Sequence, residues 1–181
     1  MVKGSKTKTR TAAIVIGIFM AAILALGAVA GAQFSSMQAK QNSDFGGLGS
    51  AHVHATFMVK LNGEIVDFSN PVYQVRSPYI HVENGDGFTL HRHARLVPVG
   101  EFLHSLEMDI RSSCFYLDDG TRYCDSGDKT LRFYVNGVQR GSIMDYVLID
   151  GDRILIVYGD NSQDALNRDL EMLDQLTIKP A

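Results

Sequence analysis

Apolar and polar residues alternate along several short stretches of the chain, which is the pattern of β-strands with one buried face. The first stretch covers residues 52–61, and Asn62-Gly63, the commonest two-residue hairpin turn, separates it from a second strand at residues 64–68. Its odd-numbered residues are expected to face a core: Val53, Phe57, Val59 and Leu61. The opposite face then carries His52, His54, Thr56 and Met58.

A second strand pair at residues 79–94 carries three of the six histidines in the sequence. Its loop, Gly85-Asp86-Gly87, suits a type I turn followed by a left-handed glycine. The register that this loop predicts pairs His81 with His91, Glu83 with Thr89, and Tyr79 with His93. Because side chains alternate between the faces of a strand, the three imidazoles are expected to converge on one face.

Apolar residues at helical spacing predict two helices. The first, at residues 99–107, has an apolar stripe that should cover the sheet. The second, at residues 160–176, has Asp160 and Gln163 spaced as a capping box. Its leucines lie on one face, and we expect that face to pack on the domain rather than on a partner.

Two further turns and one long apolar run complete the pattern. Asn136-Gly137 and Asp150-Gly151 mark turns, and the nearly continuous apolar run at residues 153–158 is typical of a central strand buried on both faces. We therefore predict an α+β fold: a mainly antiparallel sheet of hairpins, one short covering helix and a C-terminal helix. The order of elements resembles β-grasp domains at the level of the fold only.

The two cysteines, Cys114 and Cys124, flank a predicted hairpin whose three-residue loop ends in Gly120. The symmetry centre of this hairpin is Asp119, so the cysteines should lie directly opposite each other, within reach of a disulfide. Free structural thiols or metal thiolates are the alternatives. Export of the domain would favour the disulfide.

The N-terminal region predicts that export. Residues 11–32 form an uncharged apolar run of about the ~20 residues that span a bilayer, and basic residues precede it. A cleaved signal peptide is the alternative, because small residues near Ala30 resemble a cleavage site. The predicted parts are a basic cytoplasmic tail (1–10), a transmembrane anchor (11–32), a flexible linker (33–50), an extracytoplasmic His-rich sheet domain (51–159), and a C-terminal helix and tail (160–181).

The net charge and the motifs argue against two classes of function, nucleic-acid binding and catalysis. A net charge of -3, together with export, argues against nucleic-acid binding. The sequence has no phosphate-binding glycine loop, nucleophile elbow or dinucleotide fingerprint, so we expect a non-catalytic protein.

The spacing of the histidines indicates metal binding. Two His-x-His pairs on neighbouring strands can present several neutral imidazole nitrogens to one point, which suits copper(II) or zinc once the cysteines are oxidised. The predicted ligands are His52, His54, His81, His91 and His93, with Glu83 and Met58 as further candidates. Met58 would suit copper(I). His104 lies off the apolar stripe of its helix, and we expect it to be a solvated residue.

Several motifs together resemble one protein family: HVHATFMVKLNG, YIHVENGDGFTLHRHA, VGEFLHSL, LRFYVNG and DGDRILIVYG. It is a family of membrane-anchored, extracytoplasmic His-rich proteins seen in ammonia-oxidising archaea, with distant bacterial relatives. The resemblance covers residues 51–176, and it implies the location and a shared His-rich domain but no particular activity. The bacterial relatives have a shorter His-containing hairpin.

Two functions from different classes follow. The first is a membrane-anchored module that binds copper or zinc for acquisition, buffering or delivery outside the cytoplasm. The second is a non-catalytic accessory or interaction subunit of a membrane-bound complex, in which the histidines line a solvated face.

Overall fold

A computed structural model describes residues 20, 23, 45–160 and 162–178 of the chain. The predicted anchor at residues 11–32 lies outside this part of the chain except for Met20 and Ile23, which are helical. Among the described residues, no helix is both long enough and apolar enough to cross a membrane. Residues from Phe45 onwards form one compact unit.

A seven-stranded sheet runs through this unit in the order β3-β4-β1-β10-β8-β9, and β2 pairs with the end of β1. Its strands are β1 (Val53–Leu61), β2 (Glu64–Ile65), β3 (Ile80–His81), β4 (Thr89–Arg92), β8 (Lys129–Val135), β9 (Val138–Arg140) and β10 (Arg153–Asp160). A short 3-10 helix, η1 (Pro71–Tyr73), lies in the connection between β2 and β3.

The two Asn-Gly turns form as predicted. Asn62 and Gly63 both have positive φ angles, of 52° and 92°, and Asn136 and Gly137 have φ angles of 51° and 75°. Positive φ at both central residues defines the turn whose twist matches a hairpin, and asparagine and glycine tolerate it best. These turns join β1 to β2 and β8 to β9.

The α+β class is confirmed, but the sheet is mixed rather than uniformly built from hairpins. β10 lies between β8 and β1, as expected for the strand buried on both faces, and it pairs with β1 in parallel. A parallel pair needs a long crossover connection, and here most of the domain separates the two strands. Turn motifs in a sequence predict hairpins, and a hairpin joins two antiparallel strands. The parallel pair was therefore not predicted.

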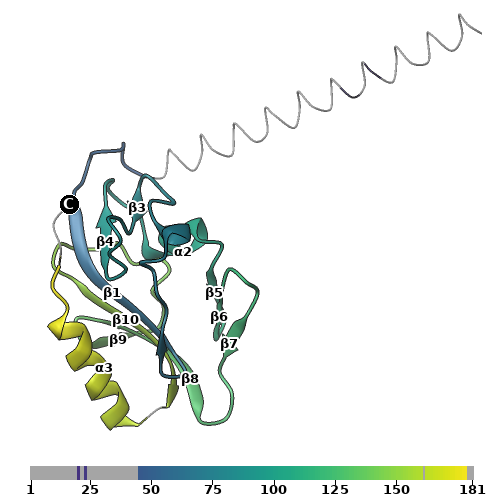
Figure 1. Ribbon diagram of the computed structural model, residues 1–181, viewed down its shortest axis with the longest axis vertical. Coiled ribbons are helices and arrows are strands. Elements are labelled where there is room, and N and C mark those ends of the chain that lie inside the picture. The colour runs from purple at the N-terminus through teal and green to yellow at the C-terminus, as the bar shows by residue number, and fades with distance from the viewer. Residues whose placement is uncertain (1–19, 21–22, 24–44, 161, 179–181) are drawn as a thin grey trace, which may run out of the picture. The chain divides into compact units, whose positions relative to one another are not determined.

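Different elements pack against the two faces of the sheet (Figure 1). One face packs against helix α2 (Val99–Ser105) and a second, three-stranded sheet of β5 (Asp109–Arg111), β6 (Cys114–Tyr116) and β7 (Arg122–Cys124). The other face packs against helix α3 (Gln163–Gln175), whose buried leucines contact β1 and β10. Packing of α3 on the domain therefore agrees with the prediction.

The predicted N-cap of this last helix is wrong. Ser162 is the N-cap, and its hydroxyl accepts a hydrogen bond from the backbone N–H of Ala165. A serine side chain at this position bonds to the third helical N–H, so the N-cap lies two residues after Asp160 and the helix begins at Gln163.

The domain begins at Phe45, before the predicted end of the linker at Ser50. The ring of Phe45 packs edge-on against Tyr79, with the ring centroids 5.9 Å apart. The N–H groups of Gly46 and Gly49 donate hydrogen bonds to the carbonyls of Arg95 and His93. These backbone bonds add the segment to the edge of the histidine-bearing hairpin.

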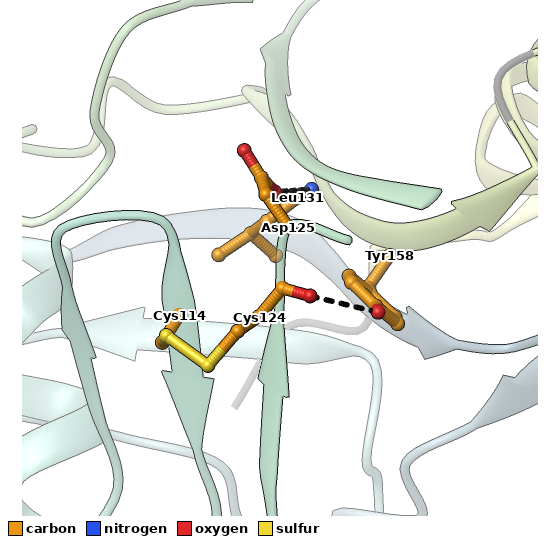
Figure 2. The surroundings of a disulfide bond; sticks show 5 residues. All are labelled: Cys114, Cys124, Asp125, Leu131 and Tyr158. Atoms are coloured by element: carbon orange, nitrogen blue, oxygen red, sulfur yellow. Dashed lines mark hydrogen bonds between the residues drawn. A yellow bond between two sulfur atoms is a disulfide. The ribbon is translucent and has the colours of Figure 1, made fainter. Parts of the chain in front are cut away.

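The predicted disulfide is present between Cys114 and Cys124, with an S–S distance of 2.07 Å. The two residues are directly opposite partners in the β6–β7 pair, as the predicted loop requires. Figure 2 shows how this hairpin joins the main sheet: the Tyr158 hydroxyl of β10 donates to the Cys124 carbonyl at 2.9 Å, and Asp125 accepts from the Leu131 N–H at 2.7 Å.

Candidate metal centre

Strand pairing brings the two His-x-His segments together. In the β1–β4 pair His54 lies opposite His91, and in the β3–β4 pair His81 lies opposite His91. The N–H of His93 donates to the carbonyl of Tyr79 at 2.8 Å, which continues the same register. The predicted register of the central hairpin is therefore correct at its histidines.

The turn of this hairpin differs from the prediction. The N–H of Asp86 bonds to the carbonyl of Glu83 at 2.9 Å, and Asn84 and Gly85 have positive φ angles of 57° and 70°. The turn is thus a two-residue Asn-Gly turn, not Gly85-Asp86-Gly87. The register survives because residues 86–88 lie outside the strand ladder, where they loop before β4 begins.

Two residues of that loop have other structural roles. A Cβ atom on Gly87 would lie 2.5 Å from the backbone nitrogen of Ser69, so glycine permits a close backbone approach there. The predicted pairing of Glu83 with Thr89 does not form, because the β3–β4 ladder contains only the pairs Ile80–Arg92 and His81–His91. Glu83 is left free to turn towards the histidines.

Five imidazoles form a closed ring of neighbours. All five lie on the face of the sheet against which α3 packs, but at the other end of β1. Strand alternation puts His54 on the same side of β1 as Met58, which α3 covers. The ring-centroid distances around the circuit are 4.7 Å for His54–His52, 5.1 Å for His52–His93, 4.9 Å for His93–His81, 6.1 Å for His81–His91 and 4.7 Å for His91–His54.

Burial differs strongly across this histidine ring. His81 and His91 are 6% and 2% exposed, whereas His52 is exposed to solvent. Glu83 stands beside the buried pair: its Oε2 lies 3.3 Å from Nε2 of His81, and its Oε1 lies 3.8 Å from Nδ1 of His91. The ring therefore has a buried side with a carboxylate and a side open to water.

The His81–Glu83 contact has an unusual electrostatic requirement. Nδ1 of His81 lies 2.7 Å from the carbonyl oxygen of Ser77, and a carbonyl can only accept, so Nδ1 must carry the hydrogen. In a neutral imidazole, Nε2 then presents a lone pair to the carboxylate of Glu83. Two lone pairs at 3.3 Å repel each other unless a proton or a metal cation lies between them.

His91 is held in its neutral form. Burial is the main cause that lowers its pKa, Glu83 acts in the opposite direction, and the imidazoles of His54, His81 and His93 lower it as well, which together bring it to about 4. Its Nδ1 is buried and has no hydrogen-bond partner among the described residues. Such an atom costs about 1–3 kcal/mol of stability unless something else satisfies it.

The same causes act on His93. Burial lowers its pKa below the usual value for histidine, and the imidazoles of His81, His52 and His54 lower it further, against the pull of Glu83. A neutral imidazole is the form that binds a metal, so both residues can bind a metal without first losing a proton.

Met58 and His104 lie outside the ring. Met58 shares the face of His54 but is 1% exposed in the apolar cluster beneath α3, with Leu155 and Leu173. The structure does not bring its thioether to the histidines. His104 lies on α2, where Nε2 is 3.2 Å from Asp109 and the side chain is 56% exposed, as expected for a solvated residue.

Sequence reasoning missed Asp150. Its carboxylate accepts a hydrogen bond from the backbone N–H of His54 at 2.8 Å and lies 3.9 Å from Nδ1 of that residue. The approach follows from the parallel β1–β10 pairing, which also places Gly151 against the carbonyl of His54. In the sequence Asp150 carries only a turn signal.

No three His, Cys, Asp or Glu side chains in the described part of the chain are already grouped so that they could hold a metal ion. The close approaches are pairwise: Nε2 of His52 to Nε2 of His54 at 3.1 Å, and Nε2 of His81 to Oε2 of Glu83 at 3.3 Å. Ligand atoms on one tetrahedral ion, at bonds of ~2.0–2.1 Å, lie about 3.4 Å apart. Each pair therefore has the spacing of two ligands, and rotation of a neighbouring imidazole would supply a third.

Comparison with known proteins adds no family to this description. No family model, no curated protein and no solved structure matches the chain.

Proposed function

We propose that this chain is a membrane-anchored extracytoplasmic module that binds copper or zinc through the histidine ring, for acquisition, buffering or delivery of the metal. The observation that carries the proposal is the contact between Nε2 of His81 and Glu83, because Nδ1 is already committed to Ser77. Metal-binding histidines commonly donate their second ring nitrogen to a backbone carbonyl in this way.

The composition of the ring supports the choice of metal. Its donors are imidazole nitrogens and one carboxylate, and the described cysteines are bonded to each other, so thiolate ligands are absent from this part of the chain. Nitrogen with some oxygen suits copper(II) or zinc. The parallel pairing of β1 with β10 is in keeping with a β-grasp-like arrangement, which we retain as an analogy of fold.

The location rests on the sequence. The apolar run at residues 11–32 follows four basic residues: Lys3, Lys6, Lys8 and Arg10. That order favours an N-terminus in the cytoplasm and the histidine ring on the outer side of the membrane. The disulfide is in keeping with an oxidising compartment.

Calorimetric titration of the full chain, purified without a His-tag, tests the proposal. We expect saturable binding of zinc or copper(II), and at least tenfold weaker affinity after His91→Ala or His93→Ala, because each change removes a ligand. His104→Ala is the matched control and should leave the affinity unchanged. Binding should also weaken as the pH falls from about 7.5 towards 5.5, because protons compete with the metal for imidazole nitrogens, and His91 and His93, whose pKa values are lowered, should contribute least to this loss.

A solvated histidine face would behave differently. It would bind metal weakly, without a defined stoichiometry, and His91→Ala, His93→Ala and His104→Ala would cause equally small losses. That result, together with stable co-purification of a membrane protein, would favour the accessory subunit instead.

A further inference from the structure

The histidine ring contains more ligands than one ion can use. Five imidazoles and the carboxylate of Glu83 lie close together. Most zinc sites have four ligands, and tetragonal copper(II) mainly binds four. A single ion would leave at least two of these side chains unused, although some are buried.

Two close ligand pairs lie on different strands. The pair His52–His54 belongs to the start of β1, and the pair His81–Glu83 belongs to the end of β3. Among the described residues, the imidazole contacts join the two pairs only through the histidines of the β4 segment: His52 contacts His93 and His54 contacts His91, and these two in turn contact His81. Ligand atoms of one ion lie within about 4.4 Å of one another, which is the span of two opposite bonds. Each pair therefore suits an ion of its own.

The geometry points to two metal ions in this ring, an inner ion on His81, Glu83 and His91, and an outer ion on His52, His54 and His93. This inference rests on the proposed function and gives its site a stoichiometry and a direction. His91 completes the inner set because its buried Nδ1 lies 3.8 Å from Glu83 and has no hydrogen-bond partner in the part of the chain that the structure describes. His93 completes the outer set because its ring lies 5.1 Å from that of His52.

Burial orders the two sites. His81 and His91 are almost fully covered, whereas His52 is exposed, so an ion reaches the ring first at the outer set. His93 lies between the two sets, with its ring 4.9 Å from that of His81. It is placed to exchange an ion with the inner set. The inner set also offers a negative charge, so it should bind a divalent ion more tightly than three neutral imidazoles do.

Equilibrium dialysis of the metal-free full chain against Zn²⁺ alone, with the bound metal counted by atomic emission, tests this arrangement. The wild-type chain should bind two zinc ions in two steps of different affinity. His52→Ala, at an exposed position, should remove the weaker step, and Glu83→Gln, which keeps the side-chain shape, should remove the tighter step. His104→Ala should retain both, and circular dichroism should show that all four chains are folded.

The possible outcomes separate the inference from the proposal beneath it. One zinc ion in the wild-type chain, weakened by both His52→Ala and Glu83→Gln, would overturn the two-ion arrangement and leave the metal-binding function standing. Two ions that are lost together in either variant would overturn the division into inner and outer sets. No bound zinc, repeated with no bound copper(II), would overturn both.

Discussion

At the scale of single residues, the burial of the His91 imidazole lowers the stability of the fold. The imidazole is buried, its Nδ1 has no hydrogen-bond partner within residues 45–160 and 162–178, and its pKa is lowered to about 4. A strand position opposite another histidine could hold a valine or an isoleucine at no such cost. Groups with perturbed protonation are concentrated at functional sites, so this cost supports a functional reading of the ring.

That burial predicts a pH dependence for the metal-free chain. The unfolded chain protonates His91 near its ordinary pKa of 6.5, whereas the folded chain resists protonation until about 4. The unfolded state therefore binds more protons between these values, and stability falls as the pH falls through the window. The charged form would also face His54, His81 and His93, with Glu83 as its one favourable neighbour.

Urea unfolding of the metal-free chain at about pH 7 and about pH 4.5 measures this effect. The wild type should lose roughly 2–3 kcal/mol more than His91→Gln does, as follows from 1.36 kcal/mol per pKa unit. His104→Gln is the control at an exposed histidine and should lose as much as the wild type. An unchanged pH slope in His91→Gln would show that His91 is not held neutral.

At the scale of elements, the three-stranded sheet packs on the main core and is cross-linked by its own disulfide. β5, β6 and β7 pair only with one another, and Cys114 is bonded to Cys124 across β6 and β7. The hydrogen bonds of Tyr158 and Leu131 tie this small sheet to the main one (Figure 2). Local opening of this unit can therefore occur while the main sheet stays intact.

Reduction of the disulfide should loosen this unit without unfolding the domain. The closed loop is short, so chain entropy gives the bond about 2–3 kcal/mol, within a typical total of ~5–15 kcal/mol. Amide hydrogen exchange before and after reduction should speed up at residues 109–124 and remain slow in β10. Cooperative loss of protection throughout the main sheet would contradict this expectation.

Helix α3 stabilises the same face of the sheet that carries the histidines, at the other end of β1. Leu173 is 1% exposed against Met58 and Leu155. The half-buried Lys60 of β1 and the buried Asp169 of the helix also form an ion pair. The histidine ring and the helix thus share one face of β1, at its two ends.

Leu173→Ala should cost about 2–5 kcal/mol, because it leaves a cavity under the helix. Met172→Ala is the neighbouring control at 38% exposure, and its effect should stay within about 0.5 kcal/mol. Chemical unfolding of both variants measures the difference. Equal and small effects would mean that the helix contributes little to the domain.

At the scale of the whole molecule, the order of parts predicts where the ring operates. A reporter enzyme fused after Ala181 should be active only when it lies outside the cytoplasm, because basic residues precede the apolar run at residues 11–32. Fusions to an exported phosphatase and to a cytoplasmic reporter give opposite readouts in the same cells. Cytoplasmic activity would contradict both metal delivery outside the cell and an exported disulfide.

Much of this molecule is determined by local sequence. Strand alternation assigned the two faces of β1, Asn-Gly dipeptides located two turns, and the symmetry of the cysteine loop predicted a disulfide that is present. The pairing of His81 with His91 is also local, since it depends on residues within one hairpin. These features could be predicted because each depends on neighbours a few residues apart, where backbone preferences and side-chain spacing dominate.

Tertiary structure decided the rest. The parallel pairing of β1 with β10 brings Asp150 to His54, and the β1–β4 pairing places His54 beside His91. It also separates Met58 from the histidines by packing α3 over it. Each of these contacts joins segments far apart in the chain, and their pairing depends on which strands bury the most apolar surface together. That choice is made by the whole domain, so no local pattern in the sequence records it.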